Sequence, residues 1–218
     1  MAERQAPSRR GETSVHGQKL DWKRFTTEQF IDFYRAETEP LKRITPNVPC
    51  TTNLMGTYPG IDYFALAKAL DFASWDNYPQ WTGYTKDDVP LAAETAFKHD
   101  LMRGVKQRPF FLMESCPSAT NWRPYARLHR PGVHILQSLQ AVGHGADSVQ
   151  YFQFRKSRGA FEKFHGAVVD HYGEPDTRTF RDVTQVGRVL ENLQPIYDTE
   201  RKAKAVSMYQ FEGLQRVP

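Results

Sequence analysis

Short apolar segments alternate with longer amphipathic ones along most of the chain, and this pattern predicts strands that alternate with helices. The predicted strands cover residues 50–55, 72–78, 109–114 and 148–154. The predicted helices cover residues 63–70, 91–105, about 130–145 and 177–193. Strands that alternate with helices pair in parallel through right-handed crossovers. The hydrophobic pattern therefore predicts an α/β fold built on a parallel sheet.

The first part of the chain has a different pattern. Residues 1–20 have no hydrophobic periodicity and predict a loop or a loose arm. Thr26–Gln29 resembles a capping box at the start of a helix, which would have an apolar face formed by Phe30, Ile31, Tyr34 and Leu41. Pro40 lies inside this helix and lacks a backbone donor, so we expect a kink or a local break there. The predicted helix ends at residues 44–46.

The composition is that of a globular protein. The chain has 218 residues, enough for one sizeable domain, and 39% of them are hydrophobic and 13% aromatic. The formal net charge is +4, but basic and acidic residues are interleaved, as in Asp21–Arg24. Such scattered charge indicates a solvated surface rather than a nucleic-acid track. We therefore predict no nucleic-acid partner.

Two further observations bear on location and cofactors. The N-terminus is polar, and no stretch approaches the roughly 20 apolar residues that span a bilayer. Cys50 and Cys116 form neither a metal-binding pair nor a disulfide framework, and both are expected to stay reduced. The sequence therefore predicts a cytoplasmic protein with no membrane contact, no metal and no cofactor.

Candidate chemistry lies at the ends of the predicted strands. Glu114 closes an apolar strand and is followed at once by a turn, and in parallel α/β folds the carboxyl ends of strands carry active sites. By itself such a glutamate is more often a surface or capping residue. The other strand ends add residues 75–79, 121–124 and 162–165, which are rich in aromatic and polar side chains. Aromatic rings that stack on C–H faces, beside groups that bind hydroxyls, suit a sugar ligand.

Each of these elements also has an ordinary structural interpretation. Trp75 and Trp122 are more often packing residues than ligand platforms, and Glu162 and His165 could form a surface pair on a helix. The histidines at positions 99, 129, 144 and 171 are interpreted as structural or solvated. Taken together, however, the polar and aromatic strand ends favour a site.

The chain resembles the β-galactosidases of glycoside hydrolase family 42 from about residue 18 to residue 200. The resemblance is carried by seven motifs that occur in order: Leu20–Phe25, Trp75–Pro79, Leu112–Ser115, Asn121–Pro124, Ala141–Asp147, Tyr151–Gln153 and Glu162–His171. The family implies a (β/α)8 barrel that hydrolyses terminal β-galactosides with retention. The four predicted strands would be strands five to eight, and strands one to four would be absent. Residues 21–198 would then form half a barrel, after an arm at 1–20 and before the start of a trimerisation-type domain at 199–218.

The resemblance also implies roles for six residues. Glu114 falls on the nucleophile of the family, Trp122 on its galactose-binding tryptophan, and Glu162 and His165 on ligands of sugar hydroxyls. Phe152 and Tyr78 match residues that line the same subsite. The implied partner is a β-galactoside, with no metal or other cofactor.

The chain departs from the family at the second catalytic group. The acid/base glutamate of the family follows an asparagine at the end of the fourth strand, and this sequence contains no Asn-Glu dipeptide. We therefore expect a fragment with little or no activity alone, which assembles poorly into the family trimer. The alternative is a non-catalytic galactoside-binding protein. A nucleic-acid-associated protein would need clustered charge, which the sequence lacks.

Overall fold

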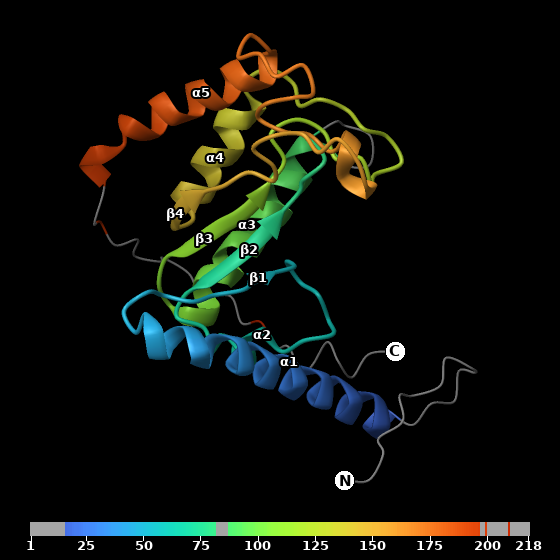
Figure 1. Ribbon diagram of the computed structural model, residues 1–218, viewed down its shortest axis with the longest axis vertical. Coiled ribbons are helices and arrows are strands. Elements are labelled where there is room, and N and C mark those ends of the chain that lie inside the picture. Colours follow the sequence, from blue (N-terminus) through green and yellow to red (C-terminus); the bar gives the residue numbers. More distant parts are fainter. Residues whose placement is uncertain (1–15, 82–86, 197–198, 200–208, 210–218) are drawn as a thin grey trace.

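Four parallel strands form one sheet in the order of the sequence, β1-β2-β3-β4 (Figure 1). This computed structural model describes residues 16–81, 87–196, 199 and 209. The strands are β1 (Asn53–Leu54), β2 (Ala73–Asn77), β3 (Phe110–Ser115) and β4 (Ala146–Val149). The helices are α1 (His16–Ile44), α2 (Tyr63–Ala67), α3 (Asp88–Lys106), α4 (Val133–Gly143) and α5 (Arg178–Glu191), with 3₁₀ turns η1 (Phe161–Phe164) and η2 (Gln194–Ile196). The predicted α/β fold with a parallel sheet is confirmed.

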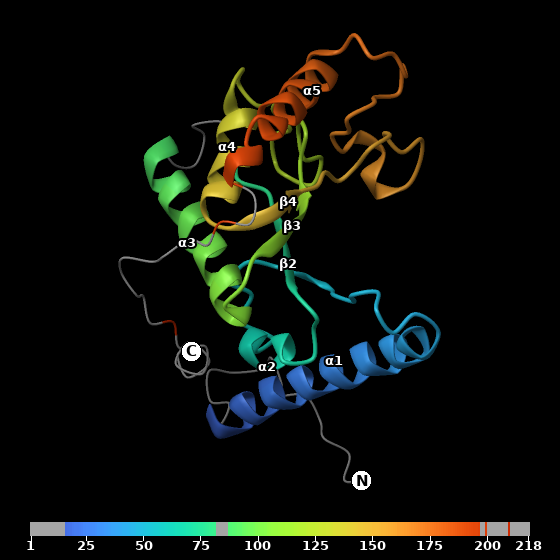
Figure 2. The same cartoon turned by 90° about the vertical axis from the view of Figure 1, so that its left-hand side faces the viewer.

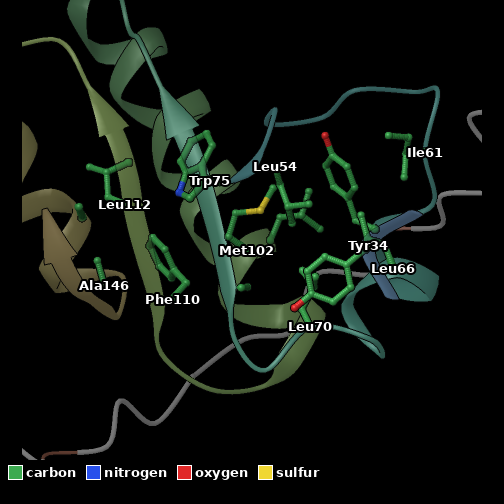
Figure 3. Packing of buried hydrophobic residues seen from close by; sticks show 14 residues of the cluster. Tyr34, Leu54, Ile61, Leu66, Leu70, Trp75, Met102, Phe110, Leu112 and Ala146 are labelled. Atoms are coloured by element: carbon green, nitrogen blue, oxygen red, sulfur yellow. The ribbon is translucent and has the colours of Figure 1, made fainter. Parts of the chain in front are cut away.

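The main core lies between the sheet and the helices on one of its faces. Figure 2 shows α3 and α4 on the same side of the strands. Side chains of paired strand residues share a face, and on this face Leu54, Trp75 and Leu112 are each at most 2% exposed. They pack in one cluster with Phe110 and with Met102 of α3, as Figure 3 shows. This apolar layer holds β1, β2 and β3 in register.

The other face of the sheet carries polar and half-buried side chains. Asn53 of β1 is exposed, and Asp76 of β2 and Phe111 of β3 are partly exposed. The rings of Phe72 and Phe111 meet there with 4.5 Å between their centroids. Within the described residues no helix covers this face (Figure 2). An open face of this kind is what half of a closed barrel presents, since the interior of a barrel is filled from all its strands.

Helix α1 begins earlier than predicted. It starts at His16, so the loop predicted for residues 1–20 is wrong for residues 16–20, and residues 1–15 lie outside the described part. The predicted capping box is also wrong, because Thr26 Oγ1 donates to the carbonyl of Trp22, 2.9 Å away and one turn back. A threonine hydroxyl can be satisfied in this way inside a helix. The helix also continues past Pro40 to Ile44 instead of breaking.

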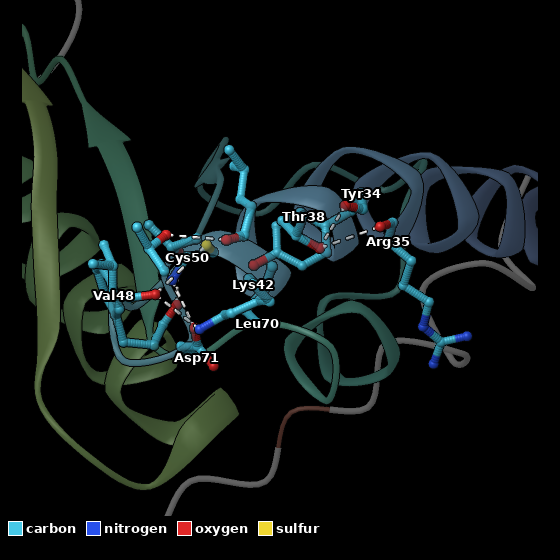
Figure 4. Close-up of polar contacts among 12 residues, drawn as sticks. Tyr34, Arg35, Thr38, Lys42, Val48, Cys50, Leu70 and Asp71 are labelled. Atoms are coloured by element: carbon cyan, nitrogen blue, oxygen red, sulfur yellow. Dashed lines mark hydrogen bonds and ion pairs between the residues drawn. The ribbon is translucent and has the colours of Figure 1, made fainter.

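A polar network ties the end of α1 to the starts of two strands (Figure 4). Lys42 Nζ donates to Asp71 Oδ2 at 2.5 Å and to the carbonyl of Val48 at 2.9 Å. The same Asp71 oxygen accepts from the backbone N–H of Cys50 at 2.6 Å. The hydrogen bonds from Lys42 and Cys50 hold the pKa of Asp71 below its usual range. The network therefore fixes the segments that lead into β1 and β2.

The fourth strand is displaced from its predicted position. β4 ends at Val149, whereas the sequence predicts a strand over 148–154. The chain still runs beside β3, since the N–H of Phe152 donates to the carbonyl of Ser115 at 3.0 Å. Its aromatic side chains make individual ring contacts there, such as Tyr151 with His134 at 5.6 Å. The apolar run that looked like a strand therefore supplies packing for a loop.

Membrane insertion by a helix finds no support in the described ranges. None of the helices there combines the length and the apolar character needed to cross a bilayer.

We expect the Phe110→Ala substitution to lower the free energy of unfolding by about 3–5 kcal/mol, because it leaves a cavity between the sheet and α3. Phe110 is 0% exposed, whereas Phe33 on α1 is 62% exposed and serves as the matched control. Urea unfolding of the two variants measures the difference. An equal, small loss for both would show that the apolar layer does not stabilise the sheet.

We also expect His99 to limit stability in acid. His99 is 1% exposed, its ring nitrogens have no hydrogen-bond partner in the described residues, and burial, helped by His144, lowers its pKa to about 3. His99 therefore binds a proton in the unfolded chain but not in the folded chain. The free energy of unfolding falls as the pH drops from about 6.5 toward 3. His99→Leu should remove about 2 kcal/mol of this loss at pH 5.

Unfolding measured at pH 7 and pH 5 tests the role of His99. The control is His171→Leu, which removes an exposed histidine instead of a buried one. If His99→Leu keeps the acid sensitivity of the parent chain, the buried imidazole is not its cause.

Candidate active site

Glu114 lies at the carboxyl end of β3, beside the end of β2. A bulge between Trp75 and Asp76 shifts the register, so that Asp76 and Glu114 become direct partners across the two strands. Both side chains therefore leave the sheet on its open face. The apolar layer beneath positions the two carboxylates, because it fixes Trp75 in the core at 1% exposure.

Tyr78 holds one oxygen of Glu114. Its hydroxyl donates to Glu114 Oε2 at 2.6 Å, from the segment that follows β2. Burial and the nearby Glu114 carboxylate raise the pKa of Tyr78 far above its usual range. The phenol therefore keeps its proton and acts as a donor. A charge-assisted hydrogen bond of this length fixes the orientation of the carboxylate.

Aromatic rings surround this carboxylate–phenol pair. The ring of Tyr78 meets that of Trp122 edge-on with 5.5 Å between centroids, and that of His165 with 5.8 Å. Phe152 meets His165 edge-on at 5.1 Å. The structure thus brings Tyr78, Glu114, Trp122, Phe152 and His165 into one cluster, although they span residues 78 to 165 of the chain.

His165 and Glu162 form the last part of the cluster. Glu162 lies on η1, and its Oε2 is 3.0 Å from Nδ1 of His165. His165 is 1% exposed, so the interpretation of the two residues as a surface pair is wrong. Burial lowers the pKa of His165, and the Glu162 and Glu114 carboxylates oppose that shift. The pair with Glu162 occupies the Nδ1 side of the buried His165 ring.

The loop that carries Trp122 is held on several sides. Arg123 lies over the Trp122 ring at 4.5 Å and donates to the carbonyl of Tyr78 at 3.2 Å. The loop meets Gly166 closely, because a Cβ there would come within 2.7 Å of the Ala119 backbone nitrogen. The Trp122 side chain is thus held in place while 49% of the residue stays exposed. The exposed indole therefore presents a flat apolar surface beside Tyr78.

A cavity of about 500 Å³ opens beside the cluster. Its size is within the usual range for small-molecule sites. Its walls come from the β1–α2 connection, the end of β2, the first turns of α3 and the Trp122 loop, and include Met55, Asp76, Tyr78, Leu91, Lys98 and Trp122. Within the described part of the chain, no three His, Cys, Asp or Glu side chains are grouped as metal ligands.

Sequence reasoning missed Asp76 as a member of the site. Its side chain accepts a hydrogen bond from Asn53 of β1 at 2.5 Å. Burial raises the pKa of Asp76 to about 6, and the neighbouring Glu114 adds to the rise while Asn53 opposes it. A signal was present, since Asp76 lies two residues before Tyr78 in the same strand-end motif. Its pairing with Glu114 depends on the bulge, which the sequence does not reveal.

A parallel sheet in sequential strand order, with carboxylates and aromatic rings gathered at its carboxyl edge, is the arrangement of an α/β enzyme built on part of a (β/α)8 barrel. Comparison with known proteins then identifies the family. The sequence model described as β-galactosidase of glycoside hydrolase family 42 matches residues 2–193. The chain belongs to this family, and the resemblance seen in the sequence is confirmed.

Named relatives and solved structures agree with this assignment. The chain is 57% identical over 209 residues to the β-galactosidase BglY of Alicyclobacillus acidocaldarius, covering 96% of this chain and 30% of the relative. It is 53% identical to a β-galactosidase from Rahnella sp. R3, with a TM-score of 0.93 over 97% of this chain and 31% of that one. A glutamate-to-alanine catalytic mutant of Gan42B, a family 42 β-galactosidase from G. stearothermophilus, matches at 45% identity and a TM-score of 0.92, covering 97% of this chain and 32% of that one.

The chain thus spans about 30% of the length of the relatives that it matches. These structures are (β/α)8 barrels, and the chain corresponds to part of one. The predicted partial barrel is confirmed.

We expect a double-mutant cycle between Tyr78 and Glu114 to give a coupling free energy of about 1.5–3 kcal/mol, because a hydrogen bond to a charged group is broken. The variants are Tyr78→Phe, Glu114→Ala and the pair, compared by urea unfolding. Tyr172→Phe replaces Tyr78→Phe in the control cycle, since Tyr172 is 74% exposed. Equal coupling in the two cycles would contradict a specific Tyr78–Glu114 interaction.

Proposed function

We propose that this chain supplies the nucleophile and the galactose subsite of a retaining β-galactosidase, with Glu114 as the nucleophile. The observation that carries the proposal is the 2.6 Å hydrogen bond from Tyr78 to Glu114 at a strand end surrounded by aromatic side chains. The bond leaves Glu114 Oε1 outside the contact with Tyr78, where it can face a substrate. The catalytic glutamate of the related Gan42B supports the choice of residue type.

The proposed reaction begins with attack by a Glu114 oxygen on the anomeric carbon of the galactoside. A carbon–oxygen ester bond forms, the glycosidic bond breaks, and its electron pair leaves with the aglycone oxygen. In retaining enzymes a second carboxyl group, about 5–5.5 Å from the first, protonates that oxygen. The sequence carries no Asn-Glu dipeptide that would match the acid/base residue of the family. We therefore propose that the chain alone turns over unactivated galactosides poorly.

The remaining four residues would hold the sugar. The exposed indole of Trp122 would stack on the C–H face of galactose, while Glu162 and His165 would bind its hydroxyls. Phe152 would complete the subsite by its edge contact with His165. Hydrogen bonds to hydroxyls that strengthen as the ring flattens favour the transition state over the bound substrate.

The domain boundaries, the partners and the location stay predictions from the sequence. Residues 21–198 would form the half barrel, and residues 199–218, of which the structure describes only 199 and 209, would begin the next domain. Three further predictions come from the sequence. They are impaired trimer assembly, the lack of a nucleic-acid partner and a cytoplasmic location.

An activated donor tests Glu114 without any need for an acid catalyst. A dinitrophenyl 2-deoxy-2-fluoro-β-galactoside has a leaving group that departs without protonation, and its fluorine slows loss of the ester. We expect intact-mass spectrometry to show one galactosyl adduct, and peptide mapping to place it on Glu114. Glu114→Gln should abolish the adduct, whereas Glu174→Gln, at an exposed loop glutamate, should keep it. An adduct on another residue, or none on the folded chain, would contradict the assignment.

The alternative is a galactoside-binding protein without chemistry. It is favoured by one observation: the proposed sugar-binding side chains meet in this chain, while the family's acid/base dipeptide is missing from the sequence. Calorimetry with galactose separates the two functions. Binding that persists in Glu114→Gln, together with no adduct in the parent chain, would establish the binding protein.

A further inference from the structure

We propose that Asp76 is a positioning residue for Glu114: its fixed carboxylate places a second negative charge beside the nucleophile and raises its reactivity. The inference rests on the proposed role of Glu114. It assigns to Asp76 a part in the reaction that differs from acid catalysis, because the residue acts through Glu114 and not on the leaving group.

The backbone brings the two carboxylates together. The bulge between Trp75 and Asp76 makes Asp76 the direct cross-strand partner of Glu114. Neighbouring strands lie about 4.8 Å apart, and partners in register project from the same face. Without the bulge, Asp76 would pair with Met113, the residue before Glu114 on β3. The bulge therefore pairs the Asp76 and Glu114 carboxylates.

The Asp76 side chain has little freedom to turn away from Glu114. Its Oδ2 accepts from Asn53 Nδ2 at 2.5 Å, which links the ends of β1 and β2. Its Oδ1 is buried and has no hydrogen-bond partner in the described residues. Burying a carboxylate oxygen without a hydrogen-bond donor costs free energy. Groups of this kind are enriched at functional sites. The arrangement does not suit a residue whose only task is to tie two strands together.

The charged groups near Asp76 come from each neighbouring element. β3 contributes Glu114, and the segment after β2 contributes Tyr78, which stays protonated. On the α3 wall of the cavity, Glu94 and Lys98 neutralise each other in an ion pair of 2.7 Å. Arg123 lines the same cavity but is turned to the Trp122 ring. Glu114 is therefore the charge to which Asp76 is coupled.

The sign of the effect follows from the chemistry of the attack. Two adjacent carboxylates repel each other, and the repulsion disappears when Glu114 becomes an ester. The relief of this repulsion is greater in the transition state than in the ground state, so it increases the rate. Because burial and Glu114 raise the pKa of Asp76 to about 6, this benefit is lost as the pH falls through that value.

The first test is the rate of Glu114 labelling by the dinitrophenyl 2-fluorogalactoside, measured between about pH 5 and pH 8. We expect the parent rate to show an inflection near pH 6. Asp76→Asn keeps the shape of the side chain and an acceptor for Asn53, but it should be about tenfold slower at pH 7.5 and lack the inflection. Asp147→Asn, at an exposed aspartate of β4, should behave like the parent. A parent-like profile for Asp76→Asn, with normal stability, would overturn the inference.

The second test does not depend on labelling. The carboxyl ¹³C signal of Asp76 is followed against pH by NMR in the parent chain and in Glu114→Gln. The Asp76 inflection should move to lower pH in Glu114→Gln, because the repelling charge is gone. An unchanged inflection would overturn the coupling even if Glu114 is labelled. A shifted inflection in a chain that forms no adduct would instead support the coupling and reject the nucleophile.

Discussion

The apolar layer between the sheet and α3 is the interaction on which the rest of the structure depends. Trp75, Phe110 and Leu112 are each at most 2% exposed and pack with Met102 in one cluster. Their burial sets the register of β2 against β3, since a slip of one residue would turn every side chain to the other face. Such a slip would expose the core and bury Glu114. The packing of this layer therefore determines both the stability of the sheet and the geometry of the site.

Above this layer, the site consists of side chains that restrain one another. Tyr78 is central, because it donates to Glu114 and its ring contacts both Trp122 and His165. The Trp122 loop is braced in turn by Arg123. Groups restrained in this way lose little further freedom on binding, which suits recognition of a small polar ligand. The open face of the sheet, however, shows that a closed barrel needs strands beyond those described here.

The sequence predicted the order and type of the elements well and their limits less well. Apolar periodicity located four strands and their helices, because each buries one face in the core. The capping-box motif was wrong at Thr26, where a hydroxyl bonds within the helix. Apolar periodicity failed at Tyr151 and Phe152, whose rings pack in a loop. Local residue types signal such positions ambiguously, since the same side chain can be satisfied inside a helix, in a strand or in a turn.

The sequence by itself therefore determined the parallel α/β class, the family and the identity of six candidate residues, because these depend on local pattern and on motifs read in order. Only the tertiary structure decided that His165 is buried, that Tyr78 bonds to Glu114, and that Asp76 pairs with Glu114 across two strands. Tyr78 and Glu114 lie 36 residues apart in the chain, and Asp76 precedes Tyr78 by two residues. These contacts arise from a register that is set by the packing of distant apolar residues, and no local stretch of sequence contains that register.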